Sequence, residues 1–374
     1  MNWSRFLAIL IKEFRQIRRD RLTFAMIVGV PIMQLILFGY AINTDPKQLP
    51  LAAVIADESE FSRSFVAGLE NSQYFRITHR PGSEAEANRL LAKGQVQFVL
   101  VIPPDFSRRL IRGEYPAMLL AADATDPAAS GNALAALNAI SQQVLAHDAS
   151  GVLAKLRPAN IPFEVRVQRR YNPEGLSRYN IVPGLLGVIL TMTMIMMTAL
   201  AMTRERERGT MENLLATPAR PFEVMVGKIA PYIVIGYVQV AVILVAAYLL
   251  FDVPMVGSLT LLSAALVLFM AANLAVGFTF STVAKNQLQA MQLTFFFFLP
   301  SLLLSGFMFP FRGMPVWAQA IGEALPLTHF LRIVRGILLK GNGIAEIAPN
   351  LWPIGAFMLV AGVVALMRYR QTLD

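Results

Sequence analysis

The sequence predicts an α-helical polytopic membrane protein with six transmembrane helices and one extracytoplasmic α/β domain inserted between the first and second helices. Three observations predict this fold class. Six apolar stretches of 17 to 23 residues contain no charged side chain. Only 15% of the chain is charged, and one polar stretch, residues 43–180, separates the first apolar stretch from the other five. Because a helix needs roughly 20 apolar residues to cross the hydrocarbon core, these stretches are long enough to span the bilayer.

The chain begins with an amphipathic segment, residues 1–21, followed by the first predicted span, residues 22–42. Apolar residues such as Trp3 and Phe14 recur at helical spacing, and most cations lie off that stripe. We expect a cytoplasmic interface helix with its cations toward anionic lipid headgroups. The alternative is an ordinary positively charged flank that anchors the first span.

The distribution of positive charge predicts the topology. The net charge is +9, but residues 43–180 are nearly neutral, so the excess belongs to the membrane part and does not indicate nucleic-acid binding. The segments 1–21, 204–228, 281–290 and 368–374 hold 14 of its Lys and Arg residues, against 4 in 252–258 and 312–350. The positive-inside rule therefore places both termini in the cytoplasm and residues 43–180 outside. We expect the protein to lie in a bacterial inner membrane.

Residues 43–180 alternate between strand-like and helix-like patterns, which predicts a compact α/β domain. Ser83 is expected to cap a helix that ends at Lys93-Gly94. The expected strands are 51–55, 96–102, 118–122 and 163–167, and the expected helices are 61–69, 83–93, 106–112 and 128–156. His79 and His147 are isolated and the carboxylates lack metal-ligand spacing, so we expect neither a catalytic set nor a metal site.

Residues 181–374 are expected to hold the second to sixth spans. Within them, residues 312–350 are too polar to span and too apolar for a plain loop. Leu327, Phe330 and Leu331 belong to one face, while His329, Arg332, Arg335 and Lys340 form another. We expect two short outer re-entrant helices there, since irregular backbone is tolerated where protein buries it.

The spans contain no ionisable side chain, which argues against a proton- or sodium-driven carrier. The sequence also lacks the G-x-x-x-x-G-K-[ST] loop that binds nucleotide phosphates. Another subunit must therefore supply energy for any uphill transport. The amide side chains of the spans are candidate lining for a translocation path, and they are Gln34, Gln239, Asn273 and Gln292.

The loop after the second span, residues 204–218, alternates Arg and Glu and ends at Pro218. Glu205–Arg208 and Arg208–Glu212 are at helical spacing, so the loop is expected to form a short exposed helix. It resembles the E-x-E-x-G-T-x-E-x-L-L-x-T-P signature of the ABC type-2 exporter permeases, large-ectodomain branch. The matching positions are Glu205, Glu207, Gly209, Thr210, Glu212, Leu214, Leu215, Thr217 and Pro218.

Three further stretches are similar to the same family in the same order along the whole chain: 171–174 with 181–184, 227–232 and 325–336. The resemblance implies a permease subunit that is not itself catalytic and exports an amphipathic or hydrophobic, drug-like or lipid-like compound. It implies that 204–218 is a coupling helix contacting a separate ABC ATP-binding subunit, present in two copies. A second permease chain, identical or paralogous, membrane lipid and a periplasmic adaptor are further implied partners. This chain would bind no cofactor, while the partner ATPase uses ATP and Mg²⁺.

Two other classes of function remain open at this point. A membrane receptor or sensor would use the α/β domain to detect a ligand, but it needs a cytoplasmic output domain. A membrane-embedded enzyme needs convergent polar residues near the bilayer surface. The longest segment predicted inside has 25 residues, and neither class explains the 204–218 signature.

Overall fold

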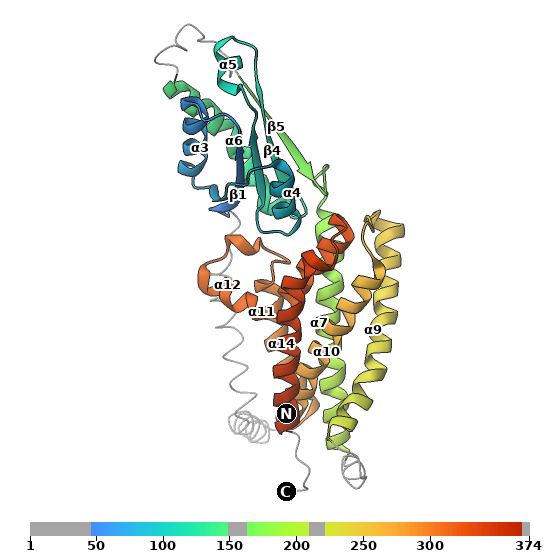
Figure 1. Cartoon of the computed structure of the whole chain (residues 1–374). Coiled ribbons are helices and arrows are strands. Elements are labelled where there is room, and N and C mark those ends of the chain that lie inside the picture. Colours follow the sequence, from blue (N-terminus) through green and yellow to red (C-terminus); the bar gives the residue numbers. More distant parts are fainter. Residues whose placement is uncertain (1–45, 149–162, 209–220, 369–374) are drawn as a thin grey trace, which may run out of the picture.

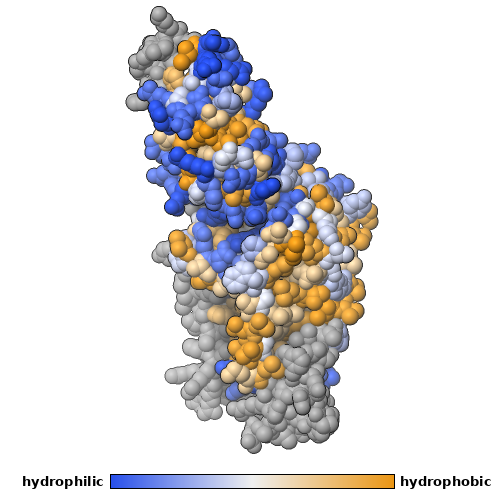
Figure 2. Space-filling model, in the orientation of Figure 1, coloured by the Kyte–Doolittle hydropathy of each residue, from blue (hydrophilic) through white to orange (hydrophobic). Residues whose placement is uncertain are grey.

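The computed structural model describes residues 46–148, 163–208 and 221–368. The predicted interface helix, the first predicted span and Gln34 lie outside these residues. The described chain forms an α/β domain stacked on a bundle of long helices (Figure 1). Hydrophilic residues dominate the visible surface of the α/β domain, and hydrophobic residues dominate that of the bundle (Figure 2).

The α/β domain contains a five-stranded sheet in the order β2-β1-β3-β4-β5. β1 is parallel to β2 and β3, β4 is antiparallel to β3, and β5 is parallel to β4. The strands are β1 (Leu49–Ile55), β2 (Phe75–His79), β3 (Phe98–Ile102), β4 (Ala117–Asp123) and β5 (Glu164–Arg170). The helices are α3 (Glu60–Asn71), α4 (Glu84–Ala92), α5 (Phe106–Ile111) and α6 (Pro127–Asp148).

Alternation along the strands sorts side chains onto the two faces of the sheet. On one face, Leu51 and Leu100 pack in the cluster that contains α3, α5 and α6, whose centre includes Phe65 and Phe106 against Phe163. On the other face, small residues of the strands pack against Leu91 of α4. The predicted helices and strands of the domain are confirmed within the described residues, including Ser83, whose hydroxyl accepts from the Glu86 amide. Strand β2 was not predicted.

Five helices of the described chain are long and apolar enough to cross a membrane. They agree with the second to sixth predicted spans, whereas the first lies outside the described residues. α10 packs along both α7 and α14, so it forms the centre of the bundle. The helices are α7 (Ser177–Glu207), α9 (Pro221–Phe251), α10 (Leu259–Val283), α11 (Gln287–Leu304) and α14 (Ile344–Arg368).

The fifth apolar stretch continues to Phe311, but its helix ends at Leu304. Gly306 has φ +83°, a conformation that ends a helix and that residues with a Cβ rarely adopt. The chain then forms the two short helices predicted within 312–350 and a π-turn that leads to α14. These elements are η3 (Phe311–Gly313), α12 (Val316–Glu323), α13 (Pro326–Arg335) and η4 (Gly336–Lys340).

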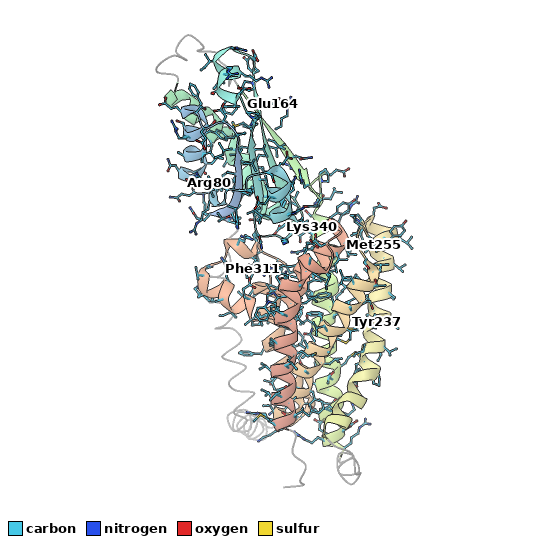
Figure 3. The ribbon with its side chains drawn as sticks, in the orientation of Figure 1. Arg80, Glu164, Tyr237, Met255, Phe311 and Lys340 are labelled. Atoms are coloured by element: carbon cyan, nitrogen blue, oxygen red, sulfur yellow. The ribbon has the colours of Figure 1, made fainter. Side chains whose placement is uncertain are left out.

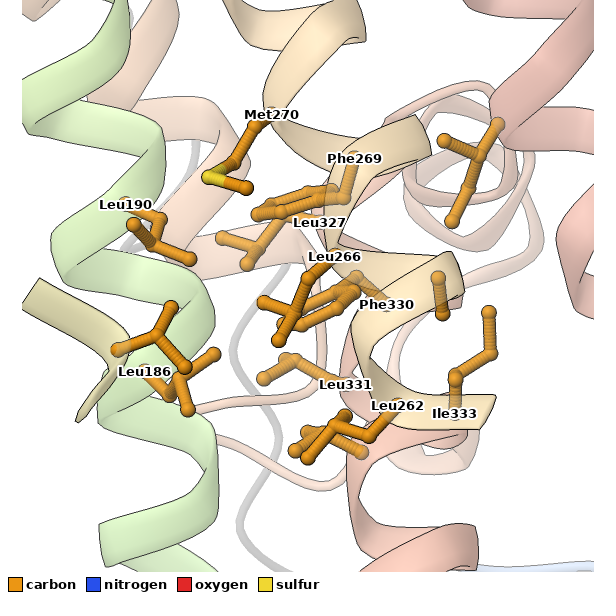
Figure 4. Packing of buried hydrophobic residues seen from close by; sticks show 14 of the residues in the cluster. Leu186, Leu190, Leu262, Leu266, Phe269, Met270, Leu327, Phe330, Leu331 and Ile333 are labelled. Carbon is orange, nitrogen blue, oxygen red and sulfur yellow. The ribbon is translucent and has the colours of Figure 1, made fainter. Parts of the chain in front are cut away.

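Helix α13 is part of the core of the bundle. Leu327 and Phe330 are fully buried against α7 and α10 (Figure 4). The rings of Phe330 and Phe269 stack with centroids 4.1 Å apart. Gly187 of α7 makes room for them, because a Cβ there would lie 2.9 Å from side-chain atoms of both Leu327 and Phe330. The fold thus holds its outer short helices and its spanning helices in one packed unit.

Candidate functional site

Two regions could carry function, one at each end of the bundle. The end away from the α/β domain holds the two described residues that are predicted to couple to an ATPase. Glu205 and Glu207 lie in the last turn of α7, the spanning helix that ends at Glu207. The other predicted coupling positions lie outside the described residues, and they are Gly209, Thr210, Glu212, Leu214, Leu215, Thr217 and Pro218.

The last turn of α7 is hydrogen-bonded to the turn between α10 and α11 and to the start of α11. The Glu207 carboxylate accepts hydrogen bonds from the backbone amide of Gln287, at 2.8 Å, and from its side-chain amide. The Arg206 guanidinium donates to the Ala284 carbonyl at 3.2 Å. Gln287 is the first residue of α11, so Glu207 accepts one of the amides that a helix start leaves free and adds negative charge there. A displacement of the loop after α7 would therefore act directly on the start of α11.

The candidate path residues lie on three different helices. Gln239 of α9 accepts a hydrogen bond from the Thr193 hydroxyl of α7 at 3.0 Å. Gln292 is half-buried on α11. Asn273 of α10 is fully buried and donates to the Phe269 carbonyl of its own helix. Its Oδ1 atom has no hydrogen-bond partner, so the described bundle contains an amide oxygen that its packing does not satisfy.

Replacing Asn273 by leucine is expected to stabilise the protein by about 1–3 kcal/mol, because it removes a buried acceptor without a partner at similar volume. Thermal unfolding in detergent checks this, with Asn71→Leu at the exposed last residue of α3 as the control. If Asn273 also lines a path, the stabilised variant will transport less well. A variant that melts below wild type would contradict this account of the unsatisfied oxygen.

The opposite end of the bundle holds a polar junction with the α/β domain that sequence reasoning missed. Three donors from the bundle reach carbonyls at the C-terminal end of α4 and just after it. Arg312 donates to Gly94 at 2.7 Å, Asn342 to Ala92 at 3.1 Å and Lys340 to Leu91 at 3.4 Å. The end of a helix leaves carbonyls unsatisfied and carries partial negative charge, so cationic donors suit this position. The sequence shows that 312–350 contains cations, but the partners of Arg312 and Lys340 lie more than 200 residues away in the chain.

Lys340 lies at the centre of this junction (Figure 3). Its ammonium forms an ion pair with Asp123 at the end of β4, and both side chains are about nine-tenths buried. Asp123 also accepts from the amide and hydroxyl of Thr125. The ammonium lies 5.1 Å from the centre of the Tyr171 ring. Burial, together with the nearby Asp123 carboxylate, raises the pKa of Tyr171, which therefore stays a neutral phenol.

The remaining polar side chains of α13 also bind within the junction. Arg332 makes a two-pronged contact with Glu323, at 2.6 and 3.0 Å, and stacks over Phe311. His329 lies 2.8 Å from the Glu323 carbonyl. Arg335 donates to Asn180 of α7 at 2.6 Å and to the Gly306 carbonyl at 3.3 Å. These contacts tie α12, α13 and α7 together directly below the α/β domain.

The chain matches a family and several known sequences over nearly its whole length. The model of the ABC-2 family transporter proteins matches residues 21–367. The chain is 29% identical to the probable multidrug ABC transporter permease YbhS of Escherichia coli over 97% of this chain and 95% of that protein. It is 27% identical to the probable multidrug ABC transporter permease YbhR of the same organism over 99% of each chain. The linearmycin resistance permease protein LnrN of Bacillus subtilis is 21% identical over 97% of this chain and 99% of that protein.

Proposed function

The chain belongs to the ABC-2 family of transporter proteins, and from this membership we propose that it is the transmembrane permease subunit of an ATP-driven exporter. The cargo is an amphipathic or hydrophobic compound, drug-like or lipid-like, taken from the cytoplasm or the inner leaflet. The uncharged spans support this cargo class, since a small ion or a highly charged metabolite would need polar or charged partners in the membrane.

The energy for export comes from a separate ABC ATP-binding subunit, present in two copies, because this sequence lacks a nucleotide phosphate-binding loop. That subunit uses ATP and Mg²⁺, while this chain is not catalytic. A second permease, identical or paralogous, completes the path. Both termini are cytoplasmic and residues 43–180 lie outside, where a periplasmic adaptor has access to them.

The observation that carries this proposal is the link between α7 and α11 next to the signature loop. ATP-driven closure of the ATPase dimer would push on the coupling segment, residues 204–218, through Glu205 and Glu212. The last turn of α7 would then move, and the Glu207–Gln287 contact would pass the displacement to α11. One push would thereby change the packing of two spanning helices at once.

Gly209→Val tests coupling. We expect the variant to insert and assemble normally but to lower ATP hydrolysis by the co-expressed ATPase to the rate of the ATPase without the permease. A β-branched residue in place of glycine blocks the bend expected between the two turns of the loop. Gly82→Val is the matched control, because a Cβ at Gly82 meets nothing within 4 Å. Wild-type hydrolysis in the Gly209→Val complex would refute the coupling role.

A further inference from the structure

A cavity of about 570 Å³ lies at the junction between the α/β domain and the outer helices. Its wall comes from the loop after α4, from the end of β4, and from α12, α13 and the start of α14. The transport proposal assigns it no role. Its size would admit a phosphate-bearing headgroup, and its lining includes Arg312 and Arg335.

These two arginines are half-buried, and their hydrogen-bond partners are neutral. Arg312 binds the Gly94 carbonyl, and Arg335 binds the Asn180 side chain and the Gly306 carbonyl. Within the described residues neither guanidinium has a carboxylate at ion-pair distance. The Nε atom of Arg335 is buried without a hydrogen-bond partner. Partly burying a guanidinium that has no carboxylate at ion-pair distance is costly, so two such groups lining one cavity favour an anion there.

The carboxylates of the same cavity are largely occupied by other groups. Asp123 is paired with Lys340, and Glu323 is paired with Arg332. Glu346 accepts the Gly343 amide at the start of α14. Asp126 also lines the cavity, and with Asp123 it opposes the lowering of the Arg335 pKa that burial causes. Burial lowers the pKa of Arg312 and the Arg332 cation acts in the same direction, while the Asp123 and Glu323 carboxylates oppose them with smaller effects. An arginine nevertheless stays protonated, so Arg312 presents a desolvated positive charge.

Under the topology proposed above, on which this placement rests, the cavity would lie at the level of the outer lipid headgroups. Trp352, on the cavity wall, is 69% exposed, and Trp317 on α12 is 41% exposed. Tryptophan concentrates at the boundary between hydrocarbon and headgroups. Val316 beside Trp317 is 83% exposed, which places an apolar edge of α12 next to the acyl region. An amphiphile could therefore keep its tail in lipid while its headgroup enters the cavity.

We propose that this cavity binds the phosphate of an anionic phospholipid from the outer leaflet, held between Arg312 and Arg335. Guanidinium groups bind phosphate oxygens through charge-assisted, often two-pronged hydrogen bonds, which fits the planar donors on this wall. The single negative charge of the bound lipid would offset part of the charge of the two arginines, and its headgroup would occupy the junction that joins the two parts of the molecule. This site does not depend on the identity of the exported compound.

The test is lipid retention by the full-length protein with its co-purified partners. The complex is placed in mixed micelles with equal phosphatidylglycerol and phosphatidylcholine, and native mass spectrometry counts the bound lipids. The wild-type complex is expected to retain phosphatidylglycerol in preference to phosphatidylcholine. Arg312→Gln and Arg335→Gln are each expected to reduce that preference roughly tenfold, as the loss of one charge-assisted contact implies. Arg335→Lys is the second variant at this position, for use if Arg335→Gln does not fold. It keeps the positive charge, so it should lose less of the preference for phosphatidylglycerol than Arg335→Gln.

The matched control is Arg166→Gln, an exposed arginine of β5 paired with Glu164, which should leave retention unchanged. Competition by inorganic phosphate would support the phosphate site and identify a free anion as its source. Resistance to inorganic phosphate with loss in both glutamine variants would support the lipid as the source. Equal retention of the two lipids by wild type, or unchanged retention in both Arg312→Gln and Arg335→Gln, would overturn the proposal.

Discussion

Replacing Lys340 by methionine is expected to destabilise the folded protein by about 3–5 kcal/mol, because it leaves the buried Asp123 carboxylate without its cation. Lys340 and Asp123 are only 8% and 9% exposed, and their ion pair joins η4 to β4 across the junction. The same change removes a donor to the Leu91 carbonyl. The measurement is thermal unfolding of the detergent-solubilised protein, followed separately by tryptophan fluorescence and by limited proteolysis of the α/β domain.

The control for this prediction is the double variant Asp123→Leu with Lys340→Met. Replacing both partners of a buried pair by apolar residues is often neutral, so the double variant should recover most of the lost stability. Asp123→Leu alone should destabilise as Lys340→Met does, since it leaves a buried ammonium. If the two single variants unfold like wild type, the ion pair does not hold the two parts together.

Replacing Gly277 by leucine is expected to destabilise the bundle by about 3 kcal/mol or more, because overpacking here strikes backbone that cannot move aside. A Cβ at Gly277 of α10 would lie 2.5 Å from the Ile195 carbonyl and 2.9 Å from Cβ of Thr198, both on α7. Small residues of this kind let spanning helices approach closely. The central pair, α7 and α10, would have to separate.

Gly362→Leu on α14 is the matched control for Gly277, since a Cβ at Gly362 meets nothing within 4 Å. Both glycines lie in spanning helices, so the two variants change hydrophobicity equally and differ in packing. Size-exclusion profiles and melting temperatures in detergent distinguish them. If the Gly277→Leu protein has the melting temperature of wild type, the α7–α10 contact is looser than the structure indicates.

Local patterns in the sequence predicted much of the fold. Long uncharged stretches predicted the five spans that the structure describes, and Ser83 followed by acidic residues predicted the start of α4. Strand β2 was missed because it is a short edge strand in which only Phe75 is fully buried. The helix of the fifth stretch ends before Phe311 because one glycine, Gly306, turns the backbone, and hydropathy does not register such a turn.

The polar junction could not be predicted from local sequence. Lys340 and Asp123 are separated by 217 residues, and either side chain alone is typical of a solvated surface. The cationic face of 312–350 was visible, but its partners depend on how the α/β domain sits on the bundle. The predicted coupling residues Glu205 and Glu207 are placed at the end of α7, where Glu207 contacts Gln287 of the same chain. Their contact with an ATPase remains a prediction from the signature loop.

The most direct test of the permease assignment is purification of the tagged protein from its native membranes in mild detergent, with bound chains identified by mass. The account predicts a co-purifying subunit that carries a nucleotide phosphate-binding loop and is lost on Glu212→Arg, while Glu114→Arg in the α/β domain retains it. The same experiment would show whether the second permease is identical to this chain or different. A preparation that contains no ATP-binding subunit, even after cross-linking in the membrane, would contradict the account.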